Sequence, residues 1–338
     1  MRTTSDIIDI HCHTAGIGAG GSGCFVSPEM RKSWRYHVYL RSFGVSEKEL
    51  EQEGDGLILR RLSDSLAASR SVSAAVVLAM DGVVGPDGEL DRTRTEVYIP
   101  NEFLAREVRR YPNLLFGASI NPYRRDAIER LERAVADGAV LLKWLPSIQI
   151  IDPSDRSLIP FYLKLKELNL PLLTHTGSES SFTWKQDELA DPVRLRLPLS
   201  LGVTVIAGHA ASNGCNQGEA NFRRFLRLCA EYPNLYADIS ALTQANRLGH
   251  LTRLLRHTEL HGRLLYGSDM PLLNTGITSP WFHAYRLSPC ALWRAVREKN
   301  PWDRDVALKR SLGVTEDILG NTGTMFANKV PLFQRGEL

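Results

Sequence analysis

The sequence predicts an α/β protein that folds as one (β/α)8 barrel of the TIM type, on three observations. Eight short, nearly continuous apolar segments recur along the 338 residues, as expected for parallel strands buried on both faces. Amphipathic segments of helical length separate most of them. The G-x-G-x-x-G at residues 16–21 opens the long segment 14–71 rather than the ~30-residue βαβ unit that the main alternative, an open doubly wound sheet, requires after its first strand.

The predicted strands are short and rich in β-branched residues, and in chain order they span residues 7–13, 73–80, 114–122, 139–147, 171–177, 203–210, 234–240 and 263–271. Helices are expected between them, over residues 101–111, 124–137, 158–169, 191–201, 217–232 and 244–261. Within 124–137, Ile128, Leu131 and Val135 share one face, and Gly138 is a suitable helix stop.

Two long segments interrupt this alternation. Residues 14–71 separate the first two strands by far more than one helix, and residues 272–300 follow the eighth strand. Both insertions leave from C-terminal strand ends, where barrel enzymes place their active sites. We interpret them as substrate-covering loops, the alternative being insertions in a tolerant surface loop. No repeat or linker marks a second domain, so residues 1–338 are predicted to form one domain.

The composition excludes several classes of protein. A formal charge of +3 gives no argument for nucleic acid or for an anionic membrane surface as a partner. No apolar run approaches the roughly 20 residues of a membrane span. The five cysteines are scattered and form no C-x-x-C pair, and the N-terminus resembles no signal peptide. We therefore expect a cytoplasmic protein whose partner is a small molecule. Homo-oligomers are expected only by analogy with other barrels.

His11 and His13 end the first strand, with Cys12 between them. Because side chains alternate along a strand, the two imidazoles should share one face and Cys12 should point to the other. The pair alone fits a metal site and two ordinary buried histidines equally well.

Three further strand ends change this balance. His175 ends the fifth strand in THTG, His209 ends the sixth in AGHA, and Asp269 ends the eighth in YGSDMP. The C-terminal ends of barrel strands meet at one rim, and imidazole and carboxylate groups suit Zn²⁺ and similar divalent ions. The sequence therefore predicts a metal site there.

These motifs resemble the amidohydrolase superfamily, and most closely its amidohydrolase-2 (amidohydrolase-related) branch. The resemblance runs from DIHCH through THTG, GHA and YGSDMP to DILGNTGTMF at 317–326. The last motif usually reads like ILGxNAxxLF. Asn321 and Phe326 match it, whereas Thr322 and Gly323 depart from it, with little expected consequence for catalysis.

The resemblance implies a metal-dependent hydrolase that carries one or two divalent ions, with zinc expected and manganese as an alternative. His11, His13, His175 and Asp269 would be metal ligands, and Asp269 would also act as general base. His209 would be either a ligand of a second ion or the group that polarises the substrate.

Lys143 lies in the fourth strand, within VLLKWLPS. Binuclear relatives such as phosphotriesterase-like enzymes use a carboxylated lysine from this strand as a metal-bridging ligand, whereas mononuclear relatives carry one without bridging. An unpaired buried ammonium is costly, so an inward Lys143 needs a partner or a modification. Three interpretations stay open: a bridging metal ligand, a supporting or substrate-binding group, and a structural ion pair.

Weaker candidates come from the loops. Four side chains just after strand ends could line a pocket, although packed or exposed residues of these types are common: Trp144, Trp184, Lys185 and Trp281. Three basic residues of the first insertion could bind a substrate carboxylate, although a solvated face is the more common role: Arg31, Lys32 and Arg35. The remaining histidines are treated as ordinary: His37, His250, His257, His261 and His283.

Three functions compete. The first is metal-assisted hydrolysis of an amide, lactone or ester, in which His209 would stabilise the oxyanion. The second is non-oxidative decarboxylation, because relatives of the aminocarboxymuconate-semialdehyde and hydroxybenzoate decarboxylase type use the same barrel. The retained H-x-H motif favours hydrolysis slightly. The third is a barrel that binds a ligand without turnover, which the full set of candidate groups argues against. The sequence does not identify the substrate.

Overall fold

A computed structural model describes residues 6–327 of the chain. Eight parallel strands form a barrel in chain order, which confirms the predicted fold class. The strands are β1 (Ile7–His13), β3 (Val72–Leu78), β5 (Leu114–Ala118), β6 (Ala139–Trp144), β7 (Leu172–His175), β8 (Val205–Gly208), β11 (Leu235–Asp238) and β12 (Leu264–Leu265). Backbone hydrogen bonds from Ile10 to Tyr266 (3.1 Å) and from His13 to Met270 (2.9 Å) join the last strand to the first.

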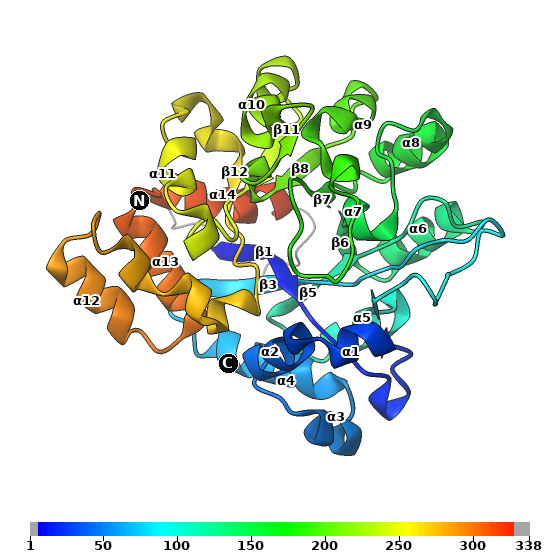
Figure 1. The fold of residues 1–338 in the computed structure, drawn as a ribbon, viewed down its shortest axis with the longest axis horizontal. Coiled ribbons are helices and arrows are strands. Elements are labelled where there is room, and N and C mark those ends of the chain that lie inside the picture. Colours follow the sequence, from blue (N-terminus) through cyan, green and yellow to red (C-terminus); the bar gives the residue numbers. More distant parts are fainter. Residues whose placement is uncertain (1–5, 328–338) are drawn as a thin grey trace.

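Helices surround this barrel (Figure 1). They include α4 (Gly56–Ala67), α5 (Asn101–Val108), α6 (Ala127–Ala136), α8 (Ile159–Glu167), α9 (Arg196–Ser200), α10 (Asn221–Glu231), α11 (His250–Leu254) and α13 (Pro301–Ser311). In α6, Leu131 is buried, Ile128 and Val135 are only partly buried against the core, and Gly138 follows the helix with φ +93°. Among the described helices, none is long and apolar enough to cross a membrane.

The prediction of one continuous helix over 244–261 is wrong. The segment instead contains the 3₁₀ turn η6 (Ala245–Arg247), the short helix α11 and the 3₁₀ turn η7 (Thr258–Arg263). Gly249 adopts φ +82° between the first two, a left-handed conformation that interrupts an α-helix. The break leaves η6 in the loop that follows β11, and its residues Asn246 and Arg247 line the pocket at the barrel mouth.

The first insertion partly covers the barrel. It contains α1 (Pro28–Lys32), α2 (Trp34–Ser42) and α3 (Glu47–Glu53), and its last helix, α4, packs against β3 as the first barrel helix. Met30, Tyr39 and Leu40 line the pocket at the strand ends, so α1 and α2 form one wall of this pocket.

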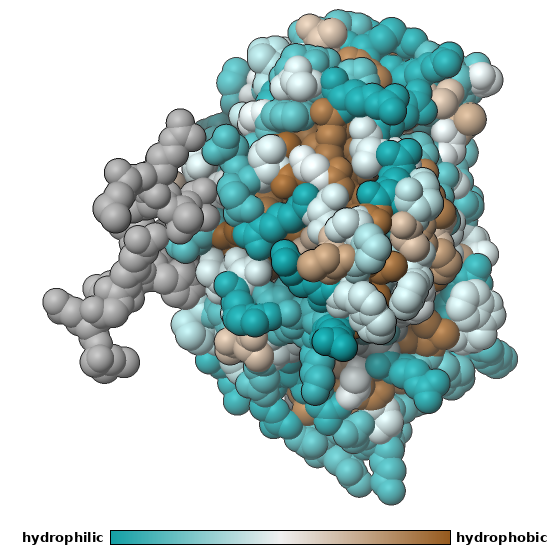
Figure 2. All heavy atoms as spheres, turned by 90° about the vertical axis from the view of Figure 1, so that its left-hand side faces the viewer, coloured by the Kyte–Doolittle hydropathy of each residue, from teal (hydrophilic) through white to brown (hydrophobic). Residues whose placement is uncertain are grey.

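The second insertion does not cover the pocket as predicted. Of residues 272–300, only Leu272 lines it. The remainder includes α12 (Pro289–Arg297), which packs back onto α13 and lies at the outside of the molecule (Figure 1). Figure 2 shows this side, where hydrophobic residues are scattered among hydrophilic ones. Trp281 and Trp293 are 56% and 55% exposed and contact each other edge to face there.

The last helix closes the opposite end of the barrel. In α14 (Glu316–Phe326), the fully buried Phe326 joins the inner barrel cluster that contains Ile8 and Ile10. A β-carbon at Gly323 would lie 2.6 Å from the carbonyl oxygen of Asp6. The departure from the family motif at Gly323 therefore has a structural role, because only glycine allows α14 to approach the start of β1.

Replacing Phe326 with alanine is expected to lower the free energy of unfolding by about 3–5 kcal/mol, because the cavity left among the inner barrel residues cannot fully collapse. Urea denaturation measures this change. Thr324→Ala is the matched control, since Thr324 is exposed on the same turn and should change stability by less than about 0.5 kcal/mol. Equal losses for the two variants would show that Phe326 does not close the barrel.

Candidate metal centre

A change of register in β1 directs both of its histidines into the barrel. Ile8 and Ile10 belong to the inner cluster, so strict alternation would also turn Cys12 inward. The pairing of β1 with β3 shifts register between Asp9 and Cys12. Cys12 therefore belongs to the other hydrophobic cluster, which also contains residues of the surrounding helices. His11 and His13 consequently share the inner face, as the sequence predicts, although it is the bulge that makes this face the inner one.

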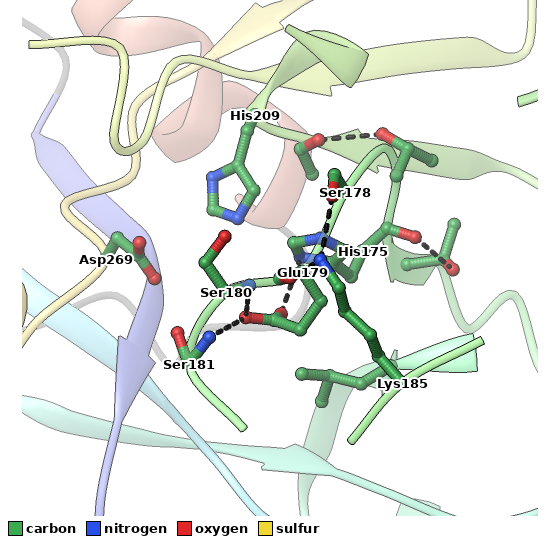
Figure 3. Close-up of polar contacts among 12 residues, drawn as sticks. His175, Ser178, Glu179, Ser180, Ser181, Lys185, His209 and Asp269 are labelled. Atoms are coloured by element: carbon green, nitrogen blue, oxygen red, sulfur yellow. Dashed lines mark hydrogen bonds and ion pairs between the residues drawn. The ribbon is translucent and has the colours of Figure 1, made fainter. Parts of the chain in front are cut away.

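The predicted residues converge at the C-terminal rim. Ring centroids lie 5.0 Å apart for His11 and His13, 4.9 Å for His11 and His209, and 5.1 Å for His175 and His209. Asp269 Oδ1 lies 3.4 Å from His13 Nε2 and 3.8 Å from His11 Nε2. One donor atom from each of His11, His13 and Asp269 lies within 4.8 Å of the other two. Figure 3 shows His175 and His209 from neighbouring strands, with Asp269 opposite.

Backbone strain is concentrated at two of these positions. His209, Ala210 and Ala211 have φ values of 56°, 47° and 48°, and Asp269 has φ 62°. Residues other than glycine rarely adopt this left-handed region, and such strain gathers at functional sites. The left-handed residues lie directly after β8 and in the segment that follows β12, and they turn the chain where His209 and Asp269 reach the pocket.

Hydrogen bonds fix the tautomers of two imidazoles. His11 Nδ1 lies 2.8 Å from Asp238 Oδ2, and His209 Nδ1 lies 2.8 Å from Ser240 Oγ and 3.2 Å from the Ser240 carbonyl oxygen. A carboxylate and a carbonyl can only accept, so each Nδ1 carries the proton. In a neutral ring the lone pair then lies on Nε2, the atom that faces the cluster and suits a metal ion.

His175 provides the test of whether a metal ion fits these residues. Its Nδ1 lies 3.5 Å from Glu179 Oε2, whereas its buried Nε2 has no hydrogen-bond partner among residues 6–327. Glu179 is held in turn by the backbone N–H groups of Ser180 and Ser181, both at 2.7 Å (Figure 3). Leaving a buried nitrogen unpaired is unfavourable, and an ion at the rim would satisfy it. The residues therefore fit a divalent metal.

Burial keeps the imidazoles neutral. It lowers the pKa of His11 to about 4 and also lowers the pKa values of His175 and His209, the latter well below its usual range. Metal coordination requires these neutral forms. Burial alone would raise the pKa of Asp269, but the facing rings of His209 and His13 outweigh it and hold that pKa well below its usual value.

Lys143 is fully buried, and its Nζ lies 2.9 Å from His11 Nε2. Burial lowers its pKa to about 8. Among residues 6–327, no carboxylate forms an ion pair with it, so the interpretation as a structural ion pair is wrong. Two interpretations of Lys143 agree with its position beside His11 Nε2. The first is a bridging metal ligand, and the second is a supporting or substrate-binding group.

Asp238 belongs to the site although no motif in the sequence identified it. This buried carboxylate accepts hydrogen bonds from the backbone N–H groups of His209 (2.9 Å) and Ser240 (3.0 Å), besides its bond to His11. Asp238 and Ser240 both lie within the predicted seventh strand, in NLYADIS. A carboxylate inside an otherwise apolar strand was the available signal.

Replacing Asp238 with asparagine is expected to weaken metal binding about 10- to 100-fold, because the amide has one acceptor oxygen in place of two and no longer orients His11. Titration of the metal-free protein with Zn²⁺ against a competing chelator measures the affinity. Asp137→Asn, which removes a surface carboxylate paired with Arg109, is the control and should leave the affinity unchanged. Unchanged affinity in both variants would mean that Asp238 does not position a ligand.

The weaker loop candidates lie outside the pocket. Trp144 is fully buried behind the sheet, where its Nε1 donates to the Ile120 carbonyl, and Lys185 pairs with Asp187 at 2.8 Å. The others also take no part in the lining: Trp184, Trp281, Arg31, Lys32 and Arg35. The histidines treated as ordinary stay outside it too: His37, His250, His257, His261 and His283.

A parallel barrel with imidazoles and carboxylates at its C-terminal rim defines a class of metal-dependent enzymes that act on small molecules. A family model described as Amidohydrolase matches residues 8–302, and the chain belongs to this family. The family includes both hydrolases and decarboxylases. No curated protein matches the sequence.

Solved structures share the fold at low identity. An uncharacterised TIM-barrel protein from Bordetella bronchiseptica is 16% identical, with a TM-score of 0.58 over 96% of this chain and 99% of that one. A proposed 2-pyrone-4,6-dicarboxylic acid hydrolase from Pseudomonas putida is 15% identical, with a TM-score of 0.54 over 96% and 98%. The 5-carboxyvanillate decarboxylase from Sphingomonas paucimobilis is 11% identical, with a TM-score of 0.50 over 96% and 98%.

Proposed function

We propose that this protein is a metal-dependent hydrolase that uses activated water to cleave an amide, lactone or ester bond in a small substrate. One observation carries the proposal. Three buried imidazoles, those of His11, His175 and His209, each direct Nδ1 to an acceptor of the protein, and Nε2 is left without a partner in His175 and contacts Lys143 in His11. This is the arrangement of metal ligands supported by a second shell of hydrogen bonds.

His11, His13, His175 and Asp269 would hold the ion, for which zinc is proposed and manganese is the alternative. A bound divalent ion would acidify a water molecule and polarise the bond to be cleaved. His209 is proposed as a further ligand rather than as the oxyanion-stabilising group, because its proton lies on Nδ1 and its Nε2 has none to donate.

Asp269 would accept the proton of the attacking water. It is ionised, faces His13, and lines the pocket in which a substrate would lie. A carboxylate at this position can hydrogen-bond the water that it deprotonates. Gln244 Nε2 approaches the second oxygen of Asp269 at 3.5 Å, which helps to hold the carboxylate in place.

Lys143 decides between one ion and two. Its lowered pKa of about 8 increases the share of neutral amine, the form that reacts with CO₂ to give a carbamate and a proton. A carbamate would supply two oxygen ligands and could bridge two ions. Without this reaction, Lys143 would contact the substrate or support His11.

Non-oxidative decarboxylation is the second candidate, and the pocket favours it in one respect. Arg247 is buried in the pocket without a carboxylate partner among the described residues, and the lining is otherwise mainly apolar. A dry pocket with one guanidinium suits a carboxylated substrate. The resemblance to 5-carboxyvanillate decarboxylase agrees with this candidate but shows the fold alone.

Metal content and isotope incorporation test the proposal together. Plasma mass spectrometry of protein purified without chelator should find about one ion per chain, or about two if Lys143 forms the bridge. A panel of lactones, esters, anilides and aromatic carboxylic acids is then incubated in H₂¹⁸O. Hydrolysis places one ¹⁸O in the acid product, whereas CO₂ release without solvent oxygen in the organic product identifies a decarboxylase. A metal-free protein that neither Zn²⁺ nor Mn²⁺ binds would overturn both functions.

A further inference from the structure

Arg247 differs from two other buried arginines of this chain. Arg124, Arg224 and Arg247 are 6%, 7% and 6% exposed. Arg124 makes two hydrogen bonds to Asp81, at 2.7 and 2.5 Å, and Arg224 makes two to Asp191, at 2.9 and 2.7 Å. Arg247 forms no ion pair among residues 6–327, and its Nε is buried without a hydrogen-bond partner.

A buried guanidinium without a partner is unfavourable, because burial removes its hydration and nothing replaces it. Burial accordingly lowers the pKa of Arg247, although Asp269, Glu179 and Asp238 attract the charge from a distance. None of these three carboxylates forms an ion pair with Arg247, since each is directed to a histidine of the cluster. The donors of Arg247 therefore stay available to a group from outside the chain.

The position of Arg247 is that of a substrate contact. It is the last residue of η6, which follows β11, and it lines the same pocket as His13, His209 and Asp269. Apolar side chains from the covering insertion and from the strand ends line the rest of this pocket: Val26, Met30, Leu40, Phe43, Leu145 and Phe182.

We propose that Arg247 binds a carboxylate of the substrate through paired hydrogen bonds, and that the substrate is a small carboxylic acid with an apolar body. A planar guanidinium matches a carboxylate in shape and charge. The other basic side chain of the lining, Lys143, is directed to His11 Nε2 at 2.9 Å, so Arg247 is the one with donors free for an acid group. The inference rests on the proposed function only in taking this pocket as the active site, and it holds for hydrolysis and for decarboxylation.

Ligand binding to the metal-free protein tests the role of Arg247 separately from the metal, which could also bind a carboxylate. Benzoate and cinnamate are titrated by calorimetry into chelator-treated wild-type protein, with benzamide and cinnamamide as neutral probes of the same shape. At least one acid should bind, and its amide should bind about 10- to 100-fold more weakly. Arg247→Met should remove this preference for the acid, and Arg247→Lys should restore only part of it, because lysine lacks the paired donors.

Arg35→Met is the matched control. Arg35 carries the same charge on the covering helix α2 and does not itself line the pocket, although its Nε donates to the carbonyl oxygen of the lining residue Ser180 at 3.3 Å. Its loss should leave the preference for the acid unchanged. If Arg35→Met removed the preference and Arg247→Met did not, the anchor would be the arginine of the insertion and the inference would be wrong.

Thermal unfolding separates substrate binding from a structural role. Removing an unpaired buried charge should leave the unliganded Arg247→Met variant at least as stable as the wild type. A clearly lower Tm would show that Arg247 is structural and would overturn the inference, as would the absence of binding by either acid. The proposed function fails separately: acid binding that depends on Arg247 in a protein that takes up no metal would keep the inference and reject the metal mechanism.

Discussion

Replacing Asp269 with asparagine is expected to lower kcat by about 10²- to 10⁴-fold, because asparagine has almost the same shape but cannot accept the proton of the attacking water. The substitution suits the backbone, since Asp269 has φ 62° and asparagine is among the residues that tolerate this region. The backbone N–H of residue 269 would still donate to the His11 carbonyl oxygen at 2.8 Å. The fold should therefore survive the substitution.

Steady-state kinetics on the variant, with metal content and circular dichroism measured on the same sample, give the result. A substrate from the panel above is needed first. Asp137→Asn serves again as the control and should keep full activity. If Asp269→Asn retained wild-type kcat with normal metal content, the general base would have to be another group. A loss of activity matched by an equal loss of metal would assign Asp269 as a ligand only.

Replacing His11 with alanine is expected to abolish metal binding after dialysis, a larger effect than the ~10- to 100-fold caused by changes around the ligands. His11 contacts three members of the site through Nδ1 and Nε2: Asp238, Lys143 and Asp269. Its removal takes away one ligand and leaves a buried carboxylate and a buried ammonium without their shared partner. Plasma mass spectrometry of the dialysed variant measures the retained metal.

Because His11 is fully buried, its loss could also disturb the fold, so a second variant is needed. His13→Ala removes a ligand at the rim, where the side chain is 19% exposed, and should lose metal without losing stability. His37→Ala, on the exposed side of α2, is the control for histidine number. Full metal occupancy in both His11→Ala and His13→Ala would show that the H-x-H pair does not bind metal.

Much of the fold could be predicted because its signals are local. Each strand is a short apolar segment buried on both faces, and this pattern identified eight strands in the correct order. The helix over 244–261 was mispredicted because Gly249 breaks it, and its apolar residues pack as separate turns. The second insertion was misplaced because α12 packs on α13, a contact between distant surfaces that leaves no periodic pattern in the sequence.

The sequence by itself determined which strand ends carry His11, His13, His175, His209 and Asp269, since barrel topology brings the C-terminal ends of parallel strands to one rim. Only the tertiary structure decided how these groups act together. The register shift in β1 turns the histidines inward, Asp238 and Ser240 fix their protonated nitrogens, and Arg247 reaches the pocket without a partner. The physical reason is that the two kinds of signal depend on residues at different separations along the sequence. Hydrophobic periodicity is a property of neighbouring residues, whereas hydrogen-bond partners and unpaired charges depend on side chains that meet only when the barrel closes.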